Sequence, residues 1–297
     1  MMNINPRDII GPNDEYLFVE DGRIIEHSSG VPSFFIQRDA DLKVIYHFNR
    51  SSEIEIRVSA GVNLNILEVF VDLAPDVDVS VNYILEPDAK VNLLSVKNSK
   101  QVGKARINAN IELSRDAYIN LNELASLPGA CELVNRIILK EKGAEVDMKS
   151  VTLNSSGFKQ TFSVQVFHNS GSTKSTLSSY GIAANASKLK ISTDGIIKPG
   201  CAKAEMRQNT KGLILDPSSH VSASPILEID NFDVVASHGA SIGAIDEEAL
   251  YYLMSRGIPR HEAEKLVISG FITPFLSAIP SERLQEWILS LINSYLR

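Results

Sequence analysis

The residues best suited to chemistry gather in one stretch, from Gly200 to Gly243. This stretch holds one of the chain's two cysteines, two of its six histidines and two glutamates, namely Cys201, His220, His238, Glu205 and Glu228. Thiolate, imidazole and carboxylate groups bind transition-metal ions, and imidazole also transfers protons near neutral pH. Taken singly, each residue has a structural explanation as a buried thiol, a turn residue or a solvated strand residue.

His238 is the strongest of these candidates because of its neighbours, in the stretch "VVASHGASIGAID" that spans residues 234–246. With the period-two alternation of a strand, Val234, Ala236 and His238 share one face. The residues around the histidine are small, and Gly239 lets another backbone approach closely. From the residues alone, a histidine satisfied in the core and a functional histidine are equally good interpretations.

Common catalytic signatures are missing from the sequence. We find no GxxxxGK[ST] phosphate loop, no GxGxxG turn, no GxSxG elbow and no HExxH motif, since "HEAEK" at His261 lacks the second histidine. Cys131 and Cys201 are seventy residues apart and form no CxxC pair. The sequence therefore predicts a protein that is not an enzyme and that binds no nucleotide itself.

Composition limits the partners and the compartment. The chain of 297 residues is 44% hydrophobic and carries 36 acidic against 29 basic residues, a net charge of -7. Scattered basic residues in an acidic chain disfavour nucleic acid as a partner. No run of 18 apolar residues and no secretion signal is present, so we expect no membrane partner and a cytoplasmic location. The low cysteine count fits that reducing compartment.

The elements that must position these residues are mainly strands. From about Leu42 to Ile229 apolar and polar residues alternate, with Asn, Asp, Gly, Ser and Pro clusters between the runs. A strand-plus-turn unit recurs at steps of 29, 28 and 27 residues, marked by Val62, Val91, Ile119 and Val146. This spacing predicts a mainly β fold, a parallel solenoid in which each coil covers the last. An ordinary β-sandwich with evenly spaced hairpins is the alternative.

After Gly243 the pattern becomes helical. Asp246 is a suitable N-cap for a first helix that Gly257 ends, and a second helix fits Pro259–Ser269, ended by Gly270. Ser281 is a suitable N-cap for a last helix. We therefore predict three parts, a short N-terminal segment (1–30), a solenoid core (31–243) and a C-terminal helical domain (244–297).

A solenoid of this kind could also be a carbohydrate-active enzyme, which would need carboxylates that converge on one exposed face. The candidates Asp72, Asp76, Asp78 and Asp88 all lie next to predicted turns. Asp bonds to its own backbone in turns, so turn chemistry is the better interpretation of these residues.

The stretch "SPILEIDNFDVVASHGASIGAIDEEALYYLMSRGIPRHEAEKLVISGF", residues 224–271, resembles the C-terminal signature of the SufB/SufD family of iron–sulfur cluster assembly proteins, in particular its SufD branch. The resemblance implies a right-handed parallel β-helix with a small C-terminal helical domain. It also implies a scaffold subunit of a SufBCD-type complex, whose members pair through their β-helices and form a transient iron–sulfur cluster between them. A SufC-like ABC-type ATPase would dock on the helical domain.

The resemblance also implies roles for individual residues. His238 matches an interface histidine that faces a cysteine of a SufB-like partner, where it would be an iron ligand shared with that partner. The other candidates of the same stretch would then lie at the cluster-assembly interface. The ATPase-docking region matches Leu250, Tyr251, Tyr252, Leu253, Arg256 and Gly257, of which the two leucines also suit the core of the helical domain.

This chain departs from the family pattern in its thiols. SufB-like members place a cysteine where this chain has Ser218-Ser219-His220, and many SufD-like members have one where Ala236 stands. We therefore expect a SufB-like partner to supply thiolates. The alternative is a self-sufficient homodimeric scaffold of a minimal system, with Cys201, Glu205 and His238 as ligands. Strand patterning that starts near residue 42 also predicts a missing or very short N-terminal helical region.

Overall fold

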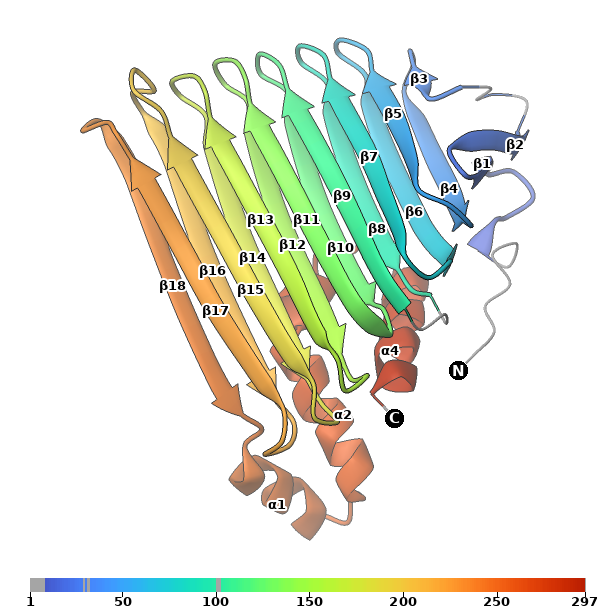
Figure 1. The fold of residues 1–297 in the computed structure, drawn as a ribbon, viewed down its shortest axis with the longest axis vertical. Coiled ribbons are helices and arrows are strands. Elements are labelled where there is room, and N and C mark those ends of the chain that lie inside the picture. Colours follow the sequence, from blue (N-terminus) through green and yellow to red (C-terminus); the bar gives the residue numbers. More distant parts are fainter. Residues whose placement is uncertain (1–8, 29, 31–32, 100–102, 297) are drawn as a thin grey trace.

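The computed structural model describes residues 9–28, 30, 33–99 and 103–296. In these residues, strands wind into a parallel solenoid of two sheets, and a helical part follows at the C-terminal end (Figure 1). The predicted mainly β solenoid with a small helical tail is confirmed, and the sandwich alternative is wrong. Of the predicted segment 1–30, residues 1–8 and 29 lie outside the described residues.

The first sheet, called sheet A here, has ten strands. They are β1 Glu15–Glu20, β2 Arg23–His27, β4 Ala40–Phe48, β6 Asn63–Leu73, β8 Lys90–Lys97, β10 Tyr118–Ser126, β12 Glu145–Asn154, β14 Lys174–Ala183, β16 Ala204–Ile214 and β18 Val234–Ala244. Their spatial order is β18-β16-β14-β12-β10-β8-β6-β4-β1-β2. All neighbours in it run parallel except β1 and β2.

The second sheet, sheet B, has eight strands, all parallel to their neighbours. They are β3 Phe35–Ile36, β5 Ser52–Val58, β7 Val77–Leu85, β9 Gly103–Leu113, β11 Gly129–Leu139, β13 Lys159–His168, β15 Lys188–Ile197 and β17 His220–Ile229. Their order is β17-β15-β13-β11-β9-β7-β5-β3. The chain alternates between the sheets, so β17 and β18 form the last coil.

The sequence repeat corresponds to stacked coils. Val91, Ile119 and Val146 are register partners on β8, β10 and β12, as the spacing predicted. The partner of Val91 on β6 is Leu64 and not Val62. Val62 lies two residues earlier, in the preceding turn. The period-two pattern therefore predicted the correct face of the strand, but at the first coil the register was wrong by two residues.

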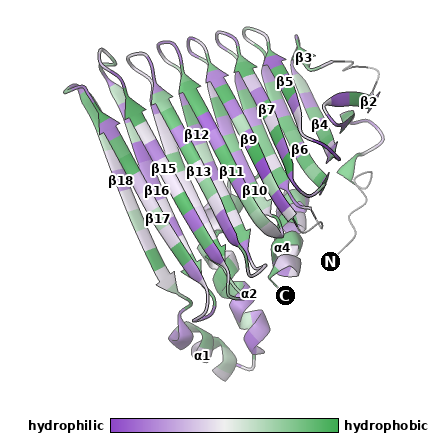
Figure 2. Ribbon diagram, viewed as in Figure 1, coloured by the Kyte–Doolittle hydropathy of each residue, from purple (hydrophilic) through white to green (hydrophobic). Residues whose placement is uncertain are grey.

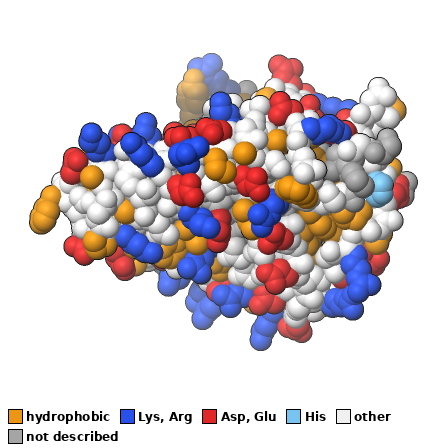
Figure 3. Space-filling view, turned by 90° about the horizontal axis from the view of Figure 1, so that it is seen from above, with side chains coloured by type: hydrophobic (Ala, Val, Ile, Leu, Met, Phe, Trp, Pro, Cys, Tyr) orange, Lys and Arg blue, Asp and Glu red, His pale blue; other side chains and the backbone are white. Residues whose placement is uncertain are grey.

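The solenoid narrows toward its last coil. Large side chains fill the first coils, among them the fully buried Tyr46, Phe48 and Phe70. In the last coils the two sheets approach one another, and Gln208 Nε2 on β16 donates to the Ile226 carbonyl on β17 at 3.4 Å. The view from above shows the narrower end at the left (Figure 3). On the inner face of the last coil, small residues such as Ala236 alternate with larger ones such as Ile242.

The helical part packs on the outer face of sheet A. It consists of α1 Glu247–Ser255, α2 Arg260–Phe271, α3 Thr273–Leu276 and α4 Glu282–Tyr295. Buried side chains of these helices form one apolar cluster with outward residues of sheet A, while a separate cluster fills the solenoid. Figure 2 shows the matching alternation of hydrophobic and hydrophilic residues along the strands. No helix in the described part of the chain is long and apolar enough to cross a membrane.

Several predicted boundaries are right and others are wrong. Asp246 caps α1, accepting from the amides of Glu248 and Ala249, and Ser281 caps α4. Helix α2 runs through Gly270 to Phe271, because tertiary packing overrides a single glycine. The short α3 was not predicted. Strands begin at Glu15 and not near residue 42, because β1 pairs with β4 and so extends the solenoid.

A charged group is buried inside the solenoid. Lys97 forms an ion pair with Glu123, with Nζ 3.0 Å from Oε1, and donates to Ser95 Oγ at 2.9 Å. Tyr83 donates to Glu68 across the core. Burial raises the pKa of Glu68, although Lys97 opposes the shift, so the protonated carboxyl is favoured. With Glu68 neutral, the buried side chains carry one positive charge, on Lys97, and one negative charge, on Glu123.

Candidate functional site

The last coil leaves both sheets with an open edge. Among the strands that the structure describes, β18 pairs only with β16, and β17 only with β15. Over its eleven residues, β18 carries no charged side chain and no proline. Long, uncharged, unprotected edge strands pair readily with another chain, and proteins usually block them with charge or proline.

The backbone of β18 presents alternate residues to this edge. The Ile245 amide donates to the Ile214 carbonyl of β16. In a parallel strand, alternate residues direct both N–H and C=O to the same neighbour. Odd-numbered residues of β18 therefore bond to β16, and even-numbered residues, His238 and Ala240 among them, direct their N–H and C=O to the open edge.

Strand β17 follows the same rule with one difference. The amides of His220 and Asp230 donate to β15, so odd-numbered residues of β17 face the open edge. Pro225 is one of these, and its missing N–H therefore removes no bond within the chain. Of the two open edges, β18 has the full set of backbone donors.

The side chain of His238 points toward the inner face of the solenoid. Its register partner on β16 is Gln208, which is buried, and parallel register partners point the same way. Ala236, two residues earlier, packs against the core cluster. His238 itself is exposed, because no further coil covers it. The predicted sharing of one face by Val234, Ala236 and His238 is correct.

The other candidates do not gather around His238. Glu205 on β16 lies on the outer face of sheet A, where Arg207 Nη1 contacts it at 3.1 Å. His220 and Glu228 lie on the outer face of sheet B, at opposite ends of β17. The sequence could not separate these residues, because their relation depends on which coil face each one takes.

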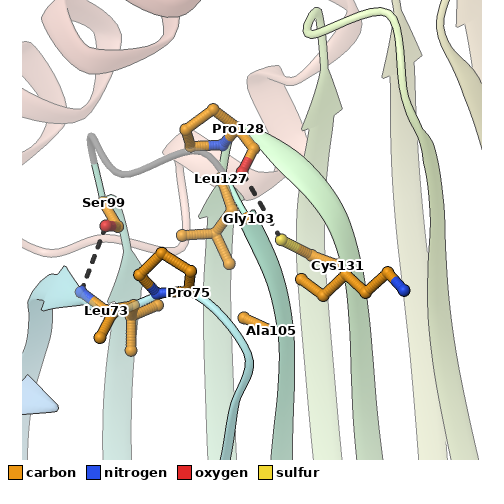
Figure 4. A pocket seen from close by; sticks show the side chains of 10 residues that line it. Leu73, Pro75, Ser99, Gly103, Ala105, Leu127, Pro128 and Cys131 are labelled. Atoms are coloured by element: carbon orange, nitrogen blue, oxygen red, sulfur yellow. Dashed lines mark hydrogen bonds between the residues drawn. The ribbon is translucent and has the colours of Figure 1, made fainter. Parts of the chain in front are cut away.

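Both cysteines of the chain are buried. Cys201 Sγ donates to the His168 carbonyl at 3.2 Å, and burial raises the pKa of its thiol. Cys131 lies beside a small cavity next to Pro128 and Gly103 (Figure 4). Burial raises the pKa of Cys131 to about 11. Neither thiol is accessible as a thiolate ligand in this conformation.

Apolar side chains surround the open edge. Exposed large hydrophobic residues occur on both strands of the last coil and in the turn between them: Ile226, Ile229, Phe232, Val235 and Ile242. Phe232 is fully exposed at the tip of that turn. Groups of exposed apolar side chains are typical of interaction surfaces. Sequence reasoning missed this patch, since alternation alone does not show which apolar side chains of the last coil remain exposed.

Helix α1 follows β18 directly and exposes a second apolar surface. Leu250 is fully buried, whereas Tyr251 and Tyr252 are 75% and 58% exposed. Arg256 stacks over the Tyr252 ring, 5.2 Å from its centroid, and donates to its hydroxyl at 3.2 Å. Gly257 has φ of 85°, which allows the chain to leave the helix. Leu253 is partly buried against the same cluster as Leu250.

The aspartates of the carbohydrate-enzyme hypothesis lie in turns or contact side chains of a neighbouring coil. Asp76 and Asp88 sit in turns with φ of 61° and 62°. Asp78 accepts from Asn108 Nδ2 at 2.8 Å, and Asp72 Oδ2 lies 3.1 Å from His47 Nδ1. Asp76 and Asp88 therefore have the predicted turn role, whereas Asp72 and Asp78 lie within β6 and β7 and contact side chains of neighbouring strands. Among the described residues, no three His, Cys, Asp or Glu side chains come together as a metal site.

Comparison with known proteins points to one family. Residues 40–271 match the family model "SUF system FeS cluster assembly, SufBD core domain". The iron-sulfur cluster assembly protein SufD of Bacillus subtilis is 35% identical over 151 residues, 51% of this chain and 35% of that protein. SufB of the same organism is 34% identical over 147 residues, 49% of this chain and 31% of that protein. A SufBD family protein of Staphylococcus epidermidis is 33% identical over an equally long region. Each match thus spans about a third of the relative's own length.

Proposed function

Because the chain belongs to the SufB/SufD family of the SUF iron–sulfur cluster assembly system, we propose that it is a non-catalytic scaffold subunit of a SufBCD-type complex. In this proposal it pairs with a SufB-like subunit through the open edge, shares a transient cluster with it and binds a SufC-like ABC-type ATPase. The complex works in the cytoplasm and involves neither nucleic acid nor membrane.

The observation that carries the proposal is the open edge of β18. The strand has eleven uncharged residues, and its even-numbered residues present free backbone groups there, flanked by exposed apolar side chains. A second β-helix that added its own edge strand would satisfy these groups and bury Val235 and Ile242. The similarity to both SufD and SufB supports a paralogue as the added chain.

The cluster is the cargo of this interface, and His238 is the ligand that this chain offers. An imidazole nitrogen is a competent iron ligand. His238 is exposed on the inner face of the last coil, and its N–H and C=O face the open edge. Since both thiols of this chain are buried, the thiolates would come from the SufB-like partner. This supports the paralogue over self-pairing.

Self-pairing is the second candidate for this interface. It would bring two copies of His238 to one seam and would need Cys201 to leave its bond to the His168 carbonyl, with Glu205 turning in from the outer face. His220 and Glu228 would contribute only through outer-face contacts with the partner, because they do not share the face of His238.

The ATPase would dock on the exposed surface of α1. Tyr251, Tyr252 and Arg256 are exposed there, next to the acidic first turn of the helix. Leu250 and Leu253 support this surface from the core, and Gly257 ends it. The nucleotide belongs to the ATPase in this proposal.

Proline substitutions test the pairing edge. Ala240→Pro removes an N–H that faces the open edge, as Pro225 does on β17, so the isolated chain should keep its thermal stability. Co-purification with a SufB-like subunit should fall at least tenfold. Ser241→Pro is the matched control, because its N–H bonds to β16; it should destabilise the chain itself by about 3 kcal/mol.

A second variant, Ala236→Pro, repeats the test at another edge-facing position. The proposal is wrong if both edge-facing variants remain folded by circular dichroism and still co-purify like the wild type. Light scattering of the chain alone, with and without Ala240→Pro, decides between the partners. A dimer of the wild-type chain that Ala240→Pro abolishes would favour self-pairing.

A further inference from the structure

A row of basic side chains crosses the outer face of sheet B. Lys159, Lys188 and His220 are the first residues of β13, β15 and β17, and each is the register partner of the next. Lys190 stands two residues along β15 on the same face. All four side chains are exposed. Neighbouring strands lie about 4.8 Å apart, so the row extends roughly 10 Å from Lys159 to His220.

No carboxylate neutralises this row among the residues that the structure describes. Asp216, which precedes β17, accepts instead from the Asn185 amide at 2.7 Å and from the hydroxyls of Ser218 and Ser219. Asp194 on β15 accepts from Ser192 Oγ at 2.9 Å. The nearby acids are therefore already bonded elsewhere.

Other charged rows of the solenoid alternate in sign. On sheet B, Asp78, Arg106 and Glu132 are successive register partners. On sheet A, Glu145, Lys174 and Glu205 follow one another in the same way. Opposite charges in register stabilise neighbouring strands, and like charges in register destabilise them. The row of Lys159 and Lys188 keeps an unfavourable arrangement that an anionic partner would relieve.

We propose that this row, with Lys190, binds an acidic, extended polypeptide segment of a partner protein. The outer face of a sheet is flat, so the lysines can follow a chain across the coils and do not enclose a single small anion. An extended segment places every second side chain on one side, about 7 Å apart, which long lysine side chains can meet. Phe158, exposed next to Lys159, offers an apolar contact for the same segment.

A polypeptide fits the surface better than nucleic acid does. Nucleic-acid sites use many basic residues to displace counterions, and this chain has a net charge of -7. The net negative charge of the protein would repel most of a nucleic acid, and the short basic row attracts only an anionic group close to it. Serine and threonine neighbours, Thr161 and Ser222 among them, add hydrogen-bonding groups for a peptide backbone. This inference does not depend on the pairing edge.

Binding of a fluorescein-labelled peptide of twelve glutamates to the full chain tests the proposal by fluorescence anisotropy. The triple variant Lys159→Gln, Lys188→Gln, Lys190→Gln should weaken binding at least tenfold. The control variant Lys90→Gln, Lys142→Gln, Lys174→Gln removes the same charge from exposed positions elsewhere and should change binding less than twofold. Binding by the wild type should weaken steeply with salt.

Three results would overturn the proposal. The first is no binding of the peptide by the wild-type chain. The second is an equal loss in both triple variants, which would mean a response to net charge alone. The third is tighter binding of polyphosphate of equal charge, or of vesicles containing phosphatidylserine, than of the peptide.

Discussion

At the scale of single residues, His238 owes its exposure to its place on the last strand. Its register partner Gln208 on β16, and the partner of Gln208 on β14, Leu177, point the same way and are buried, because the next coil covers each of them. No described coil covers β18, so a side chain in a core position is exposed at the open edge. The histidine thus has the orientation of a core residue and the exposure of a surface residue.

The buried charged group gives a prediction of pH-dependent stability. The folded-state pKa of Glu68 is raised, chiefly by burial. The stabilising contribution of Glu68 to the free energy of unfolding is therefore fully present below the unfolded pKa of about 4.3. As pH rises from there toward the folded pKa, this contribution is lost at about 1.4 kcal/mol per pH unit. Glu68→Gln should remove this slope and so gain stability relative to the wild type at higher pH.

Urea denaturation of both proteins from pH 4 to pH 8 checks this prediction. Other titrating groups, such as the buried His168 with its pKa lowered to about 4, are common to both proteins and cancel in the difference. Glu123→Gln is the contrasting variant, since it leaves Lys97 buried without its partner and should cost about 3–5 kcal/mol. Parallel stability curves for wild type and Glu68→Gln would refute the assignment.

At the scale of elements, the sequence predicted those features that depend on local hydrogen bonds and backbone conformation. Asp246 and Ser281 begin helices because their side chains accept backbone amides. Aspartates such as Asp88 sit in turns with positive φ, as their preference for turns indicated. Alternation predicted the strands and their inner faces. Local chemistry could not predict that α2 continues through Gly270, since that depends on packing against sheet A.

Helix α1 separates buried from exposed positions, and this gives a prediction for docking. The double variant Tyr251→Ala, Arg256→Ala removes two exposed side chains, so the free energy of unfolding should change by less than about 0.5 kcal/mol. Co-purification with the ATPase should fall. Leu250→Ala, one position away, should cost about 2–5 kcal/mol through a core cavity. A stable double variant that still co-purifies fully with the ATPase would exclude this surface.

At the scale of the whole molecule, the two candidate surfaces lie close together at one end. Strand β18 forms the open edge and leads through Asp246 into α1 (Figure 1). Between His238 and the start of α1 the chain runs only through residues 239–246. The last coil is narrow, and its open edge is not covered by any described strand.

The candidate site could be predicted only in part from the sequence. His238 and its small neighbours were recognisable from the signature of residues 224–271. The separation of Glu205, His220 and Glu228 from it was not, because one step in register moves a side chain to the opposite face. The burial of Cys201 depends on the turn that stacks above it, where the Lys203 amide bonds to the Asp233 carbonyl.

Cluster assembly by the complete complex with His238→Ala tests the central claim most directly. The chain, a SufB-like subunit and the ATPase would be purified together without oxygen, and iron and sulfide measured after reconstitution. His220→Ala is the matched control, an exposed histidine on the last coil but on the opposite sheet and the outer face. We expect His238→Ala to lose most of the bound iron and sulfide while the complex stays assembled, and His220→Ala to retain wild-type levels. Wild-type iron and sulfide in the intact His238→Ala complex would contradict the account.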